Sequence, residues 1–143
     1  MEGNDVSDQG GGTFRTAGAV THYCPLDLYA MGLIEESEVP PFFFVESPTG
    51  TSQNRESAPR TGVAFQGTRH DLTIADIVAA LGHRQPSPSQ SPRLHRQAFV
   101  YVVGQGHPAD SAAIAKLERF RIAWEPFFAA DTGNRMALDP RLK

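Results

Sequence analysis

Residues 24–45 most restrict the fold of this chain, because proline and glycine divide them into a short helix and a strand. Proline is well tolerated in the first turn of a helix, so Cys24-Pro25 indicates a helix start. Gly32 predicts the end of that helix within about two turns. Pro40-Pro41 then precedes the apolar residues 42–45, a pattern typical of a strand start or a sheet edge. We therefore expect a short helix followed by a core strand.

Two further segments complete a predicted small α+β fold of two or three strands and three helices. Residues 73–76 resemble a capping box and predict a helix that ends at Gly82. Residues 98–103, Ala-Phe-Val-Tyr-Val-Val, form the clearest predicted strand. A long helix with apolar residues at spacings of three and four follows from residue 110 or 111, and Pro126 predicts a kink near Ile122.

Length and composition favour a single domain over residues 1–143, since 40% of the residues are hydrophobic. Within it, the Gly/Asp-rich residues 1–20 predict a flexible segment, because a run of glycines is entropically costly to order. Residues 84–93 are rich in proline and serine and predict an internal linker.

Charge and cysteine content argue against several classes of partner and site. The 16 acidic and 13 basic residues give a formal net charge of −3 without a long run of either sign, so neither nucleic acid nor an anionic membrane is expected as a partner. The single cysteine excludes an internal disulfide and a thiolate zinc cluster. No apolar run approaches the roughly 20 residues needed to span a bilayer, and the start of the chain lacks the features of an export signal. These features do not indicate a cellular compartment.

The tract from Tyr23 to Phe44 resembles S-P-L-D-x-Y-x-M-G-L…E-V-P-P-F-F, which lies downstream of the zinc helix in a group of bacterial metzincin-like zinc peptidases. Residues 1–14 and 67–77 are also similar in kind to the corresponding parts of those proteins. The resemblance implies that Met31 belongs to a methionine turn beneath the metal, with Tyr29 as further support for the metal site. An apolar thioether beside this turn has no reason to face water, so we expect the Met31 side chain to be buried. It also implies a peptide substrate, a zinc cofactor and a secreted parent family.

Two departures from this pattern shape the predicted function. Cys24 stands where serine is expected, and no H-E-x-x-H occurs, so the usual zinc ligands and general base have no matching positions. The resemblance therefore implies the C-terminal methionine-turn lobe of a zinc-dependent peptidase, which works with an N-terminal catalytic segment. One alternative is a stand-alone metal-dependent hydrolase that cleaves an ester or lactone. The other is a catalytically inert interaction module.

Three residues are candidates for catalysis. His22 lies beside the predicted turn, although a surface or hydrogen-bonded histidine is the default for it. A thiol at a helix N-terminus has a lowered pKa, which makes Cys24 a candidate nucleophile, although a lone cysteine is usually a small buried residue. His70 precedes Asp71, but adjacent residues of a strand point to opposite faces, which argues against a direct pair.

Candidate metal ligands are His22, Asp5 and Asp8. Asp5 and Asp8 precede three glycines, and carboxylate oxygens on a glycine-rich backbone suit calcium. The alternative for this segment is a solvated flexible terminus.

Overall fold

The computed structural model describes residues 3–54 and 56–141, and it confirms the predicted α+β class with three α-helices and a long C-terminal one. The described residues contain six strands instead of two or three. The chain divides into two compact units, Met1–Ser89 and Gln90–Lys143. This division falls within residues 84–93, where the described chain forms neither helix nor strand. No helix in the described ranges is both long enough and apolar enough to cross a membrane.

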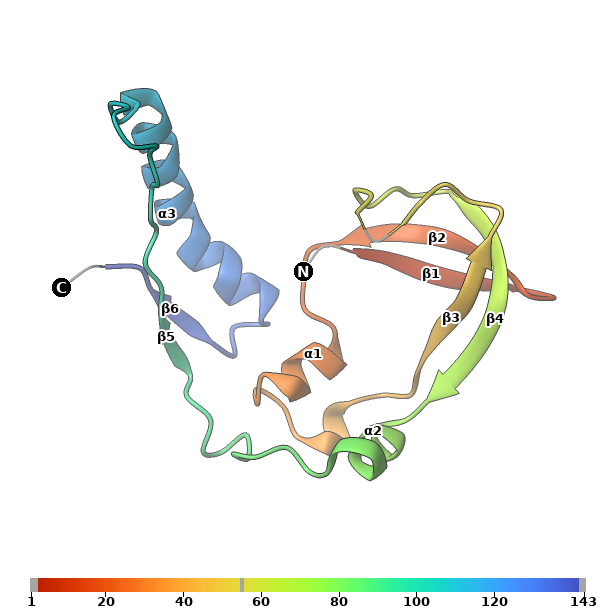
Figure 1. Ribbon diagram of the computed structural model, residues 1–143. Coiled ribbons are helices and arrows are strands. Elements are labelled where there is room, and N and C mark those ends of the chain that lie inside the picture. The colour runs from red at the N-terminus through yellow and green to blue at the C-terminus, as the bar shows by residue number, and fades with distance from the viewer. Residues whose placement is uncertain (1–2, 55, 142–143) are drawn as a thin grey trace. The chain divides into compact units, whose positions relative to one another are not determined.

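The first unit contains a four-stranded antiparallel sheet (Figure 1). Its strands are β1 (Gly3–Gly10), β2 (Thr13–Val20), β3 (Phe42–Thr49) and β4 (Ala64–Leu72). They lie in the order β1-β2-β4-β3, so β1 and β3 are the edges of the sheet. Figure 1 shows β3 and β4 bending together along their length.

The prediction of a flexible segment at residues 1–20 was wrong, because residues 3–20 form the β1–β2 hairpin. The glycines interpreted as a source of flexibility make its turn: Gly10, Gly11 and Gly12 all have positive φ, which glycine adopts without steric cost. Phe14 anchors the second strand, since it is 1% exposed and its ring lies 5.7 Å from that of Phe65. Residues 1 and 2 lie outside the described residues.

Two α-helices and a 3-10 helix flank the sheet, namely α1 (Pro25–Ala30), η1 (Glu36–Glu38) and α2 (Ile74–Leu81). The predicted starts of α1 and α2 and the end of α2 at Gly82 are confirmed. Tyr29, Ile34 and Val39 form a buried cluster against which Ile74 of α2 packs. This cluster fixes the tract of residues 23–44 to the rest of the unit.

The second unit is a β-α-β arrangement of β5 (Leu94–Arg96), α3 (Ser111–Asp131) and β6 (Ala137–Asp139). The two strands are parallel, as expected when a helix connects neighbouring strands. Asp110 caps α3 by accepting a hydrogen bond from Ala112 N at 2.8 Å. Pro126 lies inside the helix, which continues to Asp131.

The strand predicted at residues 98–103 does not form, although β5 ends only two residues before it. Because β6 has only three residues, the parallel ladder ends with the hydrogen bond from Gln97 N to Asp139 O, at 3.2 Å. The apolar segment beyond it therefore has no neighbouring strand in the described chain, and most of its residues are exposed.

Candidate functional site

An apolar cleft of about 760 Å³ in the first unit is the candidate site. Its walls come from β1, the start of α1, residues 39–45, and the loop after β3. Apolar side chains such as Val6, Leu26 and Phe43 dominate the lining. A cleft of this size and character is typical of sites that bind small molecules or apolar side chains.

One polar atom on this wall lacks a partner. Asn4, which lines the cleft from β1, has a buried Oδ1 with no hydrogen-bond partner among the described residues. A buried acceptor without a donor costs about 1–3 kcal/mol. By contrast, Thr16 Oγ1 donates to Arg60 O at 2.6 Å and accepts from Val63 N at 2.9 Å.

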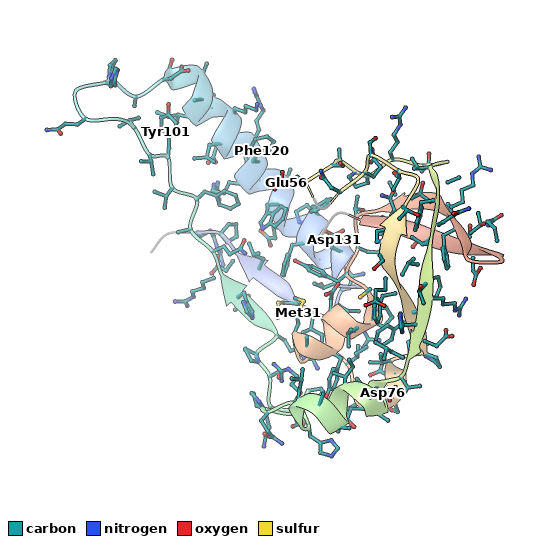
Figure 2. The ribbon with its side chains drawn as sticks, turned by 45° about the vertical axis from the view of Figure 1, so that its right-hand side comes forward. Met31, Glu56, Asp76, Tyr101, Phe120 and Asp131 are labelled. Atoms are coloured by element: carbon teal, nitrogen blue, oxygen red, sulfur yellow. The ribbon has the colours of Figure 1, made fainter. Side chains whose placement is uncertain are left out.

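The turn after α1 lies in the same tract that lines the cleft. Met31 N donates to Asp27 O at 2.8 Å, and Gly32 then adopts a φ of 75°. Leu33 N reaches back to Leu28 O at 2.8 Å, which closes the end of the helix. Figure 2 shows Met31 at this end of α1.

The side chain buried at the turn differs from the predicted one. We expected Met31 to be buried, whereas it is half-buried and Leu33 is only 1% exposed. The reversal at Gly32 directs Leu33 and Ile34 into the interior and leaves Met31 at the margin. Met31 is therefore positioned by the turn but does not form its core.

Tyr29 anchors the turn through both functions of its hydroxyl group. The hydroxyl donates to Glu36 Oε1 at 3.1 Å and accepts from Arg84 N at 3.1 Å. Arg84 Nε also donates to Ala30 O at 2.8 Å. Glu36 Oε1 lies 2.7 Å from His83 Nδ1, and this hydrogen bond, followed by that from Tyr29, holds the pKa of Glu36 below its usual value.

No local pattern in the sequence indicates that Glu36, His83 and Arg84 belong to this network. The separation of 47 residues between Glu36 and His83 gives no local periodic signal. The contact arises only because Ile74 of α2 packs on the cluster that contains Tyr29.

Cys24 is the N-cap of α1. Its Sγ accepts a hydrogen bond from Asp27 N at 3.4 Å, and the Asp27 carboxylate accepts one from Cys24 N at 3.3 Å. Partial burial raises the pKa of the thiol above its usual value and outweighs the lowering effect of the Asp27 amide. This direction is opposite to the lowered pKa that the nucleophile hypothesis required. The thiol caps the helix as a serine hydroxyl would.

The two candidate histidines lie apart in the fold. His22 is exposed in the connection between β2 and α1. His70 lies on β4, where its Nε2 is 2.9 Å from Glu46 Oε2 and its ring stacks on Phe44. Asp71 is instead paired with Arg69, 2.6 Å away, so His70 and Asp71 have different partners, as the geometry of a strand predicted.

The predicted ligands Asp5 and Asp8 lie on β1 instead of in a loop. Asp8 Oδ2 forms an ion pair with Arg69 Nη1 at 2.9 Å, and Asp8 Oδ1 accepts from Gly10 N at 2.8 Å. The hydrogen bond from Gly10 and then that from Arg69 lower the pKa of Asp8. Arg69 itself lies over the ring of Phe43, 4.2 Å from its centroid.

The structure does not assemble the predicted metal site. Among residues 3–54 and 56–141, no three His, Cys, Asp or Glu side chains are grouped so that they could hold a metal ion. His22, Asp5 and Asp8 are thus not grouped in the described residues, and Asp8 is paired with the guanidinium of Arg69.

Comparison with known proteins found no matching family model, no matching curated protein and no matching solved structure. The inference of function therefore depends on the residues of the turn and the cleft.

Proposed function

We propose that this chain is the methionine-turn lobe of a zinc-dependent peptidase, which supports the catalytic centre and contacts the substrate. The observation that carries the proposal is that one tract, residues 23–44, builds both the anchored turn and a large part of the cleft wall. A support for a metal site must hold its shape during the reaction. The two hydrogen bonds of the Tyr29 hydroxyl supply that rigidity here.

The cleft supports a role in substrate contact. Cys24, Pro25 and Leu26 line it from the N-cap and first turn of α1, and residues 39–44 line it from the segment that leads into β3 and from the first residues of that strand. Its apolar walls suit a bulky apolar side chain of a peptide, because burial contributes about 25 cal/mol per Å² of apolar surface. In this proposal the cleft selects the peptide and the turn supports the neighbouring reaction centre.

Zinc supplies Lewis acidity and activated water to peptidases of this kind. Since the described residues contain no group of three His, Cys, Asp or Glu side chains that could hold a metal ion, the proposal assigns the metal ligands to the catalytic segment that this lobe accompanies. The role of the present chain is then to position the substrate and to exclude water from around it.

One alternative is an interaction module, and the second unit favours it. Val100, Val102 and Phe120 are 74%, 82% and 55% exposed, an unusual display of large apolar side chains. The other alternative, a stand-alone ester or lactone hydrolase, gains no such support. Two of its candidate residues already have partners, since Asp8 pairs with Arg69 and His70 with Glu46.

Zinc analysis together with hydrolysis and binding assays tests the proposal. We expect the isolated chain to hold less than stoichiometric zinc, to cleave neither a casein-derived peptide nor p-nitrophenyl acetate, and to bind a Leu/Phe-containing peptide. Gln53→Trp, on the cleft wall, should weaken that binding, whereas Ser52→Trp, next to it but outside the cleft, should not. Stoichiometric zinc with chelator-sensitive turnover by this chain alone would overturn the proposal, and absence of peptide binding would favour the interaction module.

A further inference from the structure

Charge is distributed unevenly between the two units. Residues 90–143 contain eight Lys or Arg and five Asp or Glu, which give a formal charge of +3. Residues 1–89 contain five basic and eleven acidic residues, which give a formal charge of −6. The net charge of −3 for the whole chain conceals this difference. An anionic surface, not expected as a partner from that net charge, therefore suits the second unit.

Large exposed apolar side chains are concentrated in the same unit. Of the eleven that the described residues expose, nine belong to the second unit. Phe120 and Phe127 of α3 are 55% and 43% exposed, and they line an apolar groove of about 600 Å³ together with Phe99 and Trp124. Figure 2 shows Phe120 on α3. An exposed apolar surface of this kind marks a site of contact with a protein or a membrane.

Two cations lie on the groove side of α3. Lys116 precedes Phe120 by four residues and shares its face of the helix, with Nζ 5.6 Å from the centre of the Phe120 ring. Arg119 adjoins this face, because it lies three residues after Lys116 and four before Ala123. Neither cation forms an ion pair with another described residue. Both charges are therefore available to an anionic partner.

The acidic residues of α3 leave this face free of negative charge. Glu118 lies two residues before Phe120, which places it about 200° away around the helix. Glu125 follows Glu118 by seven residues and shares its stripe, and Arg121 of that stripe pairs with Glu118 at 2.6 Å. Asp131, the last residue of α3, is buried. Positive charge thus accompanies the exposed rings, whereas the exposed carboxylates of the helix lie elsewhere.

We propose that the groove side of α3 docks on the surface of an anionic lipid bilayer. Phe120 and Phe127 enter the boundary between headgroups and acyl chains, and Lys116 and Arg119 lie among the anionic headgroups. A long cationic side chain suits this position, because its stem covers apolar surface while its charge stays in water. A bilayer accepts protruding rings without a matching shape. A protein partner would have to supply both an apolar ridge that fits the groove and acidic groups at its rim.

Vesicle binding by the full chain tests this inference, which is independent of the proposed peptidase lobe. Trp124, the single tryptophan, lines the groove and reports binding by a blue shift of its emission. We expect binding to vesicles of equal parts phosphatidylcholine and phosphatidylglycerol, weaker binding to phosphatidylcholine alone, and a decrease as salt rises.

A charge variant and its control test the role of the cations. Lys116→Gln combined with Arg119→Gln should weaken binding to the anionic vesicles roughly tenfold or more, because each cation near such a surface contributes to the attraction. Arg15→Gln combined with Arg60→Gln changes the net charge equally but lies in the first unit, and it should have little effect.

Two serine variants test which side of α3 docks. Phe120 and Ile122 are 55% and 62% exposed and lie about 200° apart around the helix. Phe120→Ser should therefore weaken binding and Ile122→Ser should not, with circular dichroism as the check that both variants fold. Absence of vesicle binding, equal binding to both vesicle types, or equal effects of the two serine variants would overturn the proposal. Binding to polyglutamate without binding to vesicles would also overturn it and would indicate an acidic protein partner.

Discussion

Cys24 and Asp27 cap each other at the start of α1: the thiol accepts from the Asp27 amide at 3.4 Å, and the Asp27 carboxylate accepts from the Cys24 amide at 3.3 Å. This reciprocal arrangement is a capping box in which sulfur replaces a hydroxyl oxygen. Sulfur is a weaker acceptor than oxygen. Cys24 is therefore the N-cap of α1, and its thiol accepts a hydrogen bond from a first-turn amide that has no partner within the helix.

From this geometry we predict that Cys24→Ser keeps or raises the stability of the protein, whereas Cys24→Ala lowers it by about 1 kcal/mol, the usual effect of losing an N-cap acceptor. Urea unfolding followed by far-ultraviolet circular dichroism measures both changes. Equal stability of the Ser and Ala variants would show that the side chain at position 24 does not cap the helix.

Local patterns in the sequence predicted those elements that depend on a few neighbouring residues. The start of α1 at Cys24-Pro25 and the capping box of Thr73 with Asp76 need only contacts three residues apart, and both are present. The glycines at 10–12 were misinterpreted, because the same residues that raise backbone entropy also permit the positive φ of a hairpin turn. Nothing local to that run distinguishes the two outcomes.

Contacts between distant residues decided the remaining features. Residues 98–103 have the composition of a strand, but whether they join a sheet depends on a neighbour, and β6 is too short to provide one. The ion pair of Asp8 with Arg69 joins residues 61 positions apart, so no local pattern around Asp8 indicates this partner. For the candidate site, the sequence indicated the tract 23–44. The cleft and the Tyr29 network could be identified only from the folded structure.

The Tyr29 hydroxyl supports a second prediction. Tyr29→Phe removes the hydroxyl that donates to Glu36 and that accepts from Arg84 N. We therefore expect a loss of about 1–3 kcal/mol in unfolding free energy. Tyr101→Phe is the matched control, because Tyr101 is 39% exposed. Urea unfolding of the two variants provides the comparison. A loss in Tyr29→Phe no larger than that in Tyr101→Phe would contradict an anchoring role.

The lowered pKa of Asp8 predicts a dependence of stability on pH. Because the folded pKa lies below the ordinary value of 3.8, the carboxylate stabilises the fold above that value, and this contribution is lost as the pH falls through the folded pKa. Wild type should therefore exceed Asp8→Asn in stability at neutral pH, and the difference should shrink below about pH 4.

Urea unfolding at several pH values measures this difference, and about 1 M salt separates its causes. Salt screens the ion pair with Arg69, whereas the hydrogen bond from Gly10 N, the larger cause, persists. We therefore expect the difference to fall only in part at high salt. A difference that stays constant from neutral to acidic pH would rule out stabilisation by the charged form of Asp8.

Leu33 and Met31 support the last prediction, which concerns how the turn is stabilised. Leu33 is 1% exposed, so Leu33→Ala should lower the unfolding free energy by about 2–5 kcal/mol through lost burial and a residual cavity. Met31 is half-buried, so Met31→Ala should cost clearly less, and Met31→Leu should be nearly neutral because the volume is kept. Chemical denaturation of the three variants gives the order directly. If Met31→Ala proved as destabilising as Leu33→Ala, then the methionine would contribute as much to the core as Leu33. The turn would then be held by the thioether, and the reversal at Gly32 would not explain which side chain is buried.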